Sequence, residues 1–292
     1  ILNEGLEYID AGAFMDCKNL RYVYIPSTVK RIEASPFSGC DQLEKIVVSP
    51  DNPYYDSRGE CNAIIDTAKN MLVSGCHTTQ IPDKEVEIGC IAFASTEKLE
   101  EITIPDSVKK IEWNAFKYCK NLQHVRFSKH LEYIGEGAFA YCEKLEELDL
   151  PASVSTIEFE AFNNTPWLRN KPDGMVIVGS VLYKYKPFDG DEKVEPDCII
   201  PEGVESISDD AFYMLEKPLR IYLPKSLKTY KAGSLRCLTK YYTMIRPEGV
   251  GEDYPYTDKS YVCATVDDIV YELDNWQKTA RVVRPYDRLY RG

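Results

Sequence analysis

Residues 108–130, VKKIEWNAFKYCKNLQHVRFSKH, form one unit of a repeat that occurs along most of the chain. Aligned units share the pattern V-x-x-I-x-x-x-A-F-x-x-C-x-x-L-x-x-V-x-I-P. The aromatic position of this pattern occurs eight times, with leucine at the last: Phe14, Phe37, Phe93, Phe116, Phe139, Phe162, Phe212 and Leu235. Neighbouring positions are 23 residues apart, except for two gaps of 56 and 50 residues. A fixed period of this length predicts a solenoid of stacked coils.

Each unit predicts two short strands. The L-x-x-V-x-I part alternates like a strand with one buried face, and the proline that follows it in most units ends the strand because it has no backbone donor. The V-x-x-I part predicts a second strand, and A-F-x-x-C-x-x-L has the spacing of a short helical turn. We therefore predict a β-rich α/β repeat solenoid with short helical turns, right-handed because parallel crossovers coil that way. One unit buries too little to be stable alone, so neighbouring coils must complete its core.

The two longer gaps predict β-hairpin insertions. The first lies at about residues 49–79 and contains the strand-like segments CNAIID and NMLVSGC. The second lies at about residues 165–195 and contains MVIVG and SVLYKY. Short apolar segments joined by turn residues are typical of hairpins. We predict a solenoid over residues 1–247 and a C-terminal cap or hairpin segment over residues 248–292, where IVYEL and TARVV form a third pair.

The composition indicates an ordinary folded protein, with 44% hydrophobic, 28% charged and 12% aromatic residues. The formal net charge of −12 argues against a broad contact with nucleic acid, which needs clustered Lys and Arg. The chain has no apolar run of the length that spans a bilayer, and no signal peptide is visible in it.

The units ESISDDAF, KKIEWNAFKYCKNL and EYIGEGAFAYCEKL, each linked by an I-P or L-P strand end, resemble the BspA-like leucine-rich-repeat family over about residues 1–235. The loops NPYYDSRGECNAIID and TPWLRNKPDGMVIVGSVLYKY also resemble the NPxY-type interruptions of that family. The resemblance implies a right-handed leucine-rich-repeat solenoid without catalytic machinery. It also implies an adhesin or binding module, secreted or displayed on the cell surface.

The chain departs from ordinary leucine-rich repeats because it lacks the Asn that caps each turn. Hydroxyl residues occupy that place, and we expect their side chains to bond the turns. They are Thr28, Ser107, Ser153 and Ser226.

Four of the ten cysteines occupy one repeat position, three residues after the phenylalanine: Cys17, Cys40, Cys119 and Cys142. We interpret them as structural filler, because an unpaired Cys packs like a small hydrophobic residue. Cys61, Cys76 and Cys90 lie off that position. They leave open a disulfide that joins the hairpin to the solenoid, unpaired thiols, or a zinc site with His77, although their spacing fits no paired CxxC pattern.

No residue set predicts an active site. The three histidines, His77, His124 and His130, have no Ser or Cys nucleophile with a carboxylate at a recognised spacing. Acidic runs such as residues 143–149 are more typical of a solvated strand face than of an acid and base pair. The acidic loop 189–192 does not follow the EF-hand pattern and is interpreted as a surface turn. We predict no enzymatic activity, no cofactor and no metal.

The outward side of the first strand in each unit is the candidate binding surface, since alternate side chains of a strand face away from the core. Its candidate ligand-binding residues are Tyr22, Tyr24, Lys45, Val47, His124, Arg126, Arg220 and Tyr222. Glu101, Thr103, Glu147 and Asp149 occupy the same positions in other units. Tyr and Arg are enriched where binding energy concentrates, but they also suit strands for structural reasons.

We therefore predict a non-catalytic binding or adhesion module that recognises a protein on another cell or host surface. The alternative is a carbohydrate-binding accessory module, in which stacked tyrosines or the region of Trp167 would support sugar rings. A third hypothesis places a hydrolase activity in the loops that carry the hairpins.

Overall fold

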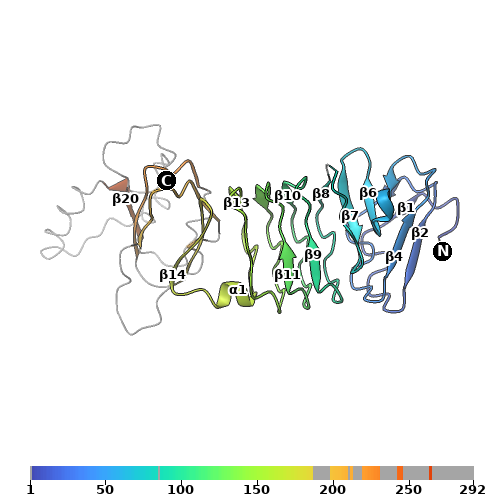
Figure 1. Cartoon of the computed structure of the whole chain (residues 1–292), viewed down its shortest axis with the longest axis horizontal. Helices are drawn as coiled ribbons and strands as arrows, with labels where there is room; N and C mark the ends of the chain where they lie inside the picture. Colours follow the sequence, from blue (N-terminus) through green and yellow to red (C-terminus); the bar gives the residue numbers. More distant parts are fainter. Residues whose placement is uncertain are drawn as a thin grey trace, which may run out of the picture. The chain divides into compact units, whose positions relative to one another are not determined.

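The computed structural model describes residues 2–84, 86–186, 198–209, 211–212, 219–230, 242–245 and 263–264. The chain divides into two compact units, Ile1–Lys171 and Pro172–Gly292. The repeats fold as a β-solenoid with turns of about 23 residues, as predicted (Figure 1). Helix is almost absent: the described residues hold η1 (Arg58–Glu60) and α1 (Pro166–Arg169). Neither segment, nor any other helix in this part of the chain, is long and apolar enough to cross a membrane.

In the first unit the predicted first strands pair in parallel, each with the strand one repeat later. Strand β2 (Tyr22–Ile25) pairs with β4 (Lys45–Val48), and β9 (Glu101–Thr103) pairs with β11 (His124–Arg126). Each strand lies beside its partner on one side of the coils (Figure 1). Paired residues are one 23-residue period apart, so the register of the sheets follows the period of the sequence.

The predicted second strands form two further ladders in the first unit. One contains β1 (Tyr8–Ile9) and β3 (Arg31–Ile32). The other has the order β13-β12-β10-β8-β7-β6-β5. Its strands are β5 (Tyr55–Asp56), β6 (Ala63–Asp66), β7 (Met71–Gly75), β8 (Glu87–Ile88), β10 (Lys110–Ile111), β12 (Tyr133–Ile134) and β13 (Thr156–Ile157). Strands β6 and β7 form the hairpin expected in the first insertion, and β7 pairs in parallel with β8. The hairpin therefore continues the ladder of the coils.

The described residues of the second unit form two four-stranded sheets, ordered β14-β15-β17-β19 and β16-β18-β20-β21. The first consists of β14 (Gly174–Val178), β15 (Val181–Lys186), β17 (Ser206–Ile207) and β19 (Thr229–Tyr230). The second consists of β16 (Cys198–Ile199), β18 (Leu219–Tyr222), β20 (Tyr242–Ile245) and β21 (Cys263–Ala264). Strands β14 and β15 form the second expected hairpin. The predicted third hairpin and the loop 189–192 lie outside the described residues, and the domain boundaries at 247 and 248 stay a prediction.

The phenylalanines of the repeat stack inside the coils. The ring centroids of Phe93 and Phe116 are 4.9 Å apart, those of Phe116 and Phe139 5.1 Å, and those of Phe139 and Phe162 5.6 Å, with the planes within 7°. Phe37 stacks on the preceding Phe14 at 5.3 Å. The four rings of the longer stack, from Phe93 to Phe162, are almost fully buried. Each coil therefore completes the core of its neighbours.

The first hairpin occupies the place between the two stacks. A side chain added at Gly75 would put its Cβ 2.2 Å from Cε1 of Phe93, so the backbone of β7 lies directly against that ring. Only glycine allows this approach without a shift of the ring or the strand.

The short helical turns that we predicted after each Ala-Phe pair are absent from the described residues, except that α1 begins four residues after Phe162. The residues two before and two after the phenylalanine have left-handed backbone, as at Asn114 (φ 53°) and Tyr118 (φ 61°) in the Phe116 coil. Alternate N–H groups leave the coil as a result. The Phe116 N–H donates to Ala138 O of the next coil at 2.8 Å, whereas the Cys119 N–H donates to Phe116 O within its own coil. Bonds between coils thus replace the helical bonds.

Hydroxyl groups cap three of the four turns where we expected them. The side chains of Thr28, Ser153 and Ser226 each donate to a backbone carbonyl one coil earlier at 2.8 Å. Ser107 differs, because its buried Oγ has no hydrogen-bond partner within the described residues.

Asn52 of the N-P-Y-Y segment is a further buried cap. Its Nδ2 donates to Pro26 O at 2.8 Å and to Val29 O at 3.0 Å. Its Oδ1 accepts from the N–H groups of Tyr54 and Tyr55 at 2.8 and 2.9 Å. One amide therefore joins the start of the insertion to the coil before it, which gives this motif a structural role.

The first strand predicted for the Phe139 unit is wrong. Residues 145–150 form no strand, and Leu148 and Leu150 are only half-buried. Strand β11 therefore pairs with β9 alone. At this end of the ladder the backbone carbonyl of Leu145 accepts from the N–H of Trp167 at the start of α1, at 2.9 Å. The loop that leads into the second insertion thus takes the place of a further parallel strand.

Candidate ligand-binding surface

Strands β2 and β4 bring four predicted residues together. Val23 and Ile25 point into the core, so Tyr22 and Tyr24 point away from it, and Tyr22 is 40% exposed. In the parallel register Tyr22 pairs with Lys45, and Tyr24 pairs with the half-buried Val47. This part of the face is a mainly apolar, aromatic surface with one cation.

Strands β9 and β11 carry the next part of the predicted face. Glu101 pairs with His124, and Thr103 pairs with Arg126. All four side chains are exposed, in agreement with strand alternation. This second part is polar and carries both signs of charge, so it differs chemically from the tyrosine surface on β2.

The segment that follows the first hairpin separates these two parts. No strand forms at residues 76–83, where the next first strand is expected. Thr78 Oγ1 instead donates to Glu44 O at 2.6 Å, and Lys98 Nζ donates to Gln42 Oε1 at 2.8 Å. His77 of this segment is half-buried, and burial, with the nearby charge of Lys98, lowers its pKa. The continuous sheet face that the repeat predicts is therefore interrupted here.

Arg220 and Tyr222 lie on β18 in the second unit, whereas the other predicted residues belong to the first unit. Tyr222 is half-buried and pairs with Ile199 of β16, which is 64% exposed. Sequence reasoning missed Ile199, although Cys198 and Ile200 on either side of it are buried. The segment Cys198-Ile199-Ile200 precedes Pro201 as the first strands of other units precede their prolines, and strand alternation there would have predicted that Ile199 is exposed.

The repeated cysteine position is structural, as predicted, in three of its four occurrences. Cys40, Cys119 and Cys142 are buried. Each thiol donates to the backbone carbonyl of the phenylalanine one coil earlier, at 3.0, 3.1 and 3.2 Å. Burial raises the pKa of Cys40 to about 11 and that of Cys119 to about 12. Cys17, in the first coil, is exposed instead.

The structure contradicts the disulfide hypothesis for the remaining thiols of the first unit. Cys61 and Cys76 are buried and Cys90 is exposed, and all three are free. Cys76 Sγ lies 3.6 Å from Asn62 O as a hydrogen-bond donor. Within the described residues, no group of three or more His, Cys, Asp or Glu side chains is arranged to hold a metal ion.

The family model for the BspA type leucine rich repeat region matches the chain in six copies, over residues 1–58, 73–172 and 188–256. The matched ranges cover well over half of the sequence. The chain belongs to the BspA-type leucine-rich-repeat family. No curated protein matches its sequence significantly.

Three solved structures are similar to this family member. The pneumococcal vaccine antigen PcpA is 18% identical with a TM-score of 0.51, over 84% of this chain and 61% of that one. A leucine-rich-repeat protein from Eubacterium ventriosum ATCC 27560 is 20% identical, with a TM-score of 0.47; the match covers 80% of this chain and 62% of that protein. A leucine rich cell surface protein from Faecalibacterium prausnitzii A2-165 is 22% identical, with a TM-score of 0.43; the match covers 88% of this chain and 62% of that protein. The chain thus spans less than two thirds of each of these proteins.

Proposed function

We propose that this chain is a non-catalytic binding module that presents the exposed face of its first strands to a protein partner. Membership of the BspA-type family suggests a protein-binding or surface module. The observation that supports a particular surface is the pair Tyr22 and Lys45, an exposed tyrosine beside a lysine on a buried strand scaffold. Tyrosine combines a large apolar area with a polar group and is enriched at protein interfaces.

The rigidity of this surface favours binding. The backbone of β2 and β4 is fixed by parallel hydrogen bonds, and Val23, Ile25 and Ile46 anchor the strands in the core. A partner therefore meets side chains whose backbone is already ordered, which lowers the entropy lost on association. Strands β2 and β4 lie side by side in parallel, at the usual strand spacing of about 4.8 Å, so the surface presents two adjacent rows of side chains to an extended partner.

We place the module outside the cell, on the cell surface or secreted. Support comes from the BspA-type repeats and from the description of the Faecalibacterium protein as a cell surface protein. The partner that fits this location is a protein on another cell or on a host surface.

A carbohydrate partner is the second candidate. Exposed tyrosines such as Tyr22 could stack on sugar rings. Trp167 cannot act in this way, because its side chain is 5% exposed, packs on Phe162 at 4.9 Å and has Lys171 Nζ over its ring at 4.7 Å. The part of the sugar hypothesis that used Trp167 is therefore wrong.

Binding of the labelled chain to intact cells tests the proposal. We expect binding to disappear after the cells are treated with protease, and to weaken in the chain carrying Tyr22→Ala with Lys45→Glu. Tyr54→Ala is the matched control, because Tyr54 is also an exposed tyrosine (46%) but lies off this face. Binding that survives protease and is lost after glycosidase treatment would favour the carbohydrate module. Turnover of a generic ester, peptide or glycoside substrate would refute the non-catalytic assignment.

A further inference from the structure

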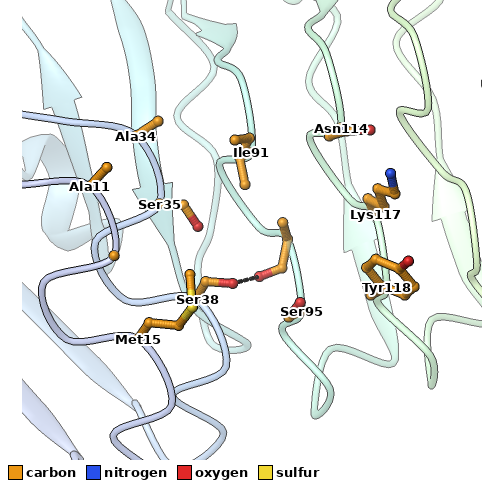
Figure 2. Close-up of a pocket in the computed structure, with 12 residues that line it drawn as sticks. Ala11, Met15, Ala34, Ser35, Ser38, Ile91, Ser95, Asn114, Lys117 and Tyr118 are labelled. Carbon is orange, nitrogen blue, oxygen red and sulfur yellow. Dashed lines mark hydrogen bonds between the residues drawn. The ribbon is translucent and has the colours of Figure 1, made fainter.

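A groove of about 420 Å³ opens on the side of the first unit where the repeated phenylalanines lie. Its walls come from the coils of Phe14 and Phe37 on one side and those of Phe93 and Phe116 on the other (Figure 2). Small residues such as Ala34, Ser35 and Ser95 line it, with Met15 and Tyr118 at its margins. It is separate from the strand face of the proposed function, so either site can fail without the other.

The groove exists because the first hairpin interrupts the bonds between coils. In the regular part of the stack, the N–H groups of Ile91, Phe93 and Ser95 donate to carbonyls of the next coil. At the interruption these bonds are replaced. Gly75 N–H of the hairpin donates to Ala92 O at 2.9 Å, and Ser38 Oγ donates across to Ala94 O at 3.1 Å (Figure 2).

The replacement leaves three backbone donors without acceptors. The N–H groups of Ser35, Phe37 and Gly39 are the counterparts of those of Ile91, Phe93 and Ser95. Within the described residues they make no hydrogen bond. Ser35 and Ser38 line the groove, and Phe37 and Gly39 flank Ser38. Buried N–H groups are nearly always paired, so these donors favour a ligand rich in acceptors.

The spacing of these donors favours peptide carbonyls as the acceptors. They occur on alternate residues, and in the next pair of coils the same donors bond carbonyls two residues apart, those of Trp113, Ala115 and Lys117. An extended peptide offers carbonyls at this spacing along one edge. A single small anion could accept a hydrogen bond from one of these N–H groups but not from all three.

Two side chains add a preference to the site. Ile91 lines the groove in left-handed backbone (φ 58°), where glycine, asparagine or serine stand in several other coils. A β-branched residue is disfavoured there, and such strain is common at functional sites. Lys117 is the one charged side chain among the lining residues, in a chain of net charge −12. A cation in this position favours a partner with an acidic group.

We propose that this groove binds an extended peptide segment that carries an acidic side chain. The peptide bonds the row of backbone donors on the Phe37 coil, packs small apolar groups against Ile91, and places its carboxylate near Lys117. The site is thus a break in the solenoid that a foreign strand completes.

Peptides selected from a phage-displayed heptapeptide library on the intact chain provide the probe, and each is then synthesised and measured by fluorescence anisotropy. We expect the selected peptides to be acidic. Their affinity for the chain should fall about tenfold or more in the Ala34→Trp variant, whose new side chain fills the groove. The matched control is Glu136→Trp, an exposed residue at the same repeat position of another coil. Trp113 already occupies that position in the Phe116 coil, so the fold accepts tryptophan there. Lys117→Gln should weaken the acidic peptides and leave their neutral amide analogues unchanged.

Amide hydrogen exchange followed by NMR supplies the second readout. In the free chain the amides of Ser35, Phe37 and Gly39 should exchange faster than those of Ile91, Phe93 and Ser95, and the peptide should slow them. Ile91→Asn should raise the melting temperature and weaken peptide binding. Protection of the three amides from exchange in the free chain would refute the proposal. It would also be refuted if no selected peptide lost affinity in the Ala34→Trp variant. Binding of acidic oligosaccharides but not peptides also refutes it.

Discussion

Replacing Phe139 tests the stacked core of the solenoid. Its ring is fully buried, lies between those of Phe116 and Phe162 at 5.1 and 5.6 Å, and meets the edge of Phe127 at 5.7 Å. A buried Phe→Ala substitution costs about 3–5 kcal/mol in free energy of unfolding. The three ring contacts contribute about 0.5–1.5 kcal/mol each to that loss, so we expect a value near the upper end for Phe139→Ala. Phe139→Asp should cost more, because it adds an unpaired charge to the core.

Phe14→Ala is the matched control in the first coil. Phe14 is half-buried and stacks on one ring, that of Phe37 at 5.3 Å. Half of the burial of a phenylalanine and one ring contact correspond to about 1–3 kcal/mol. Urea unfolding followed by far-UV circular dichroism measures both variants against the parent chain. Equal destabilisation of the two variants, or a Phe139→Asp variant as stable as the parent, would refute the stacked core.

The remaining predictions concern the first hairpin and the thiols. Asn52→Ala removes four hydrogen bonds of a buried amide and should lower the free energy of unfolding by about 2–4 kcal/mol in the same urea assay, since each bond contributes about 1 kcal/mol. Gly75→Ala should lower it by about 1–3 kcal/mol, because the new Cβ would overlap the ring of Phe93; an unchanged midpoint would contradict that packing. Burial raises the pKa of Cys40 to about 11 and of Cys119 to about 12, so both thiols should resist DTNB at pH 8 in the folded chain and react in urea. The unfolded chain loses these protons first, near pH 9, so stability should fall from there up to the folded pKa values, and a flat profile above pH 9 would contradict the burial.

The coils and their register could be predicted from the sequence. The positions of the phenylalanines fix which residues lie one coil apart, and the observed strand pairs, such as Tyr8 with Arg31 and Lys110 with Tyr133, follow the same 23-residue period. Both described hairpins also follow from the sequence, because each insertion contains two apolar segments of strand length.

The local backbone around each phenylalanine could not be predicted. The apolar spacing there matches a helix, but a helix would leave this side of the coils without bonds between them, so that the strands alone would join neighbouring coils. Left-handed residues such as Ile91, Tyr118 and Tyr141 (φ 58°, 61° and 62°) redirect alternate N–H groups toward the next coil. Isoleucine and tyrosine rarely adopt that conformation, so at these three positions the residue type gave no signal, whereas glycine or asparagine at the same repeat positions of other coils is typical of it.

The candidate surface was predictable residue by residue but not as a whole. Alternation correctly gave Tyr22, His124 and Arg126 as exposed. The division of the face depends on residues 76–83 and 145–150, which form no strand because the insertions next to them change the path of the chain. The groove beside the Phe37 coil was missed for the same reason, since it is created by the fit of the hairpin against Phe93.

The dependence of each coil on its neighbours is tested most directly by the circular dichroism of a synthetic peptide of residues 108–130 beside the intact chain. Burial of about six apolar side chains supplies roughly 9–18 kcal/mol, whereas ordering the residues costs on the order of 1.5 kcal/mol each, about 35 kcal/mol in all. We predict a disordered spectrum for the peptide and a β-rich spectrum with cooperative melting for the intact chain. A peptide that folds by itself as a monomer would contradict the account.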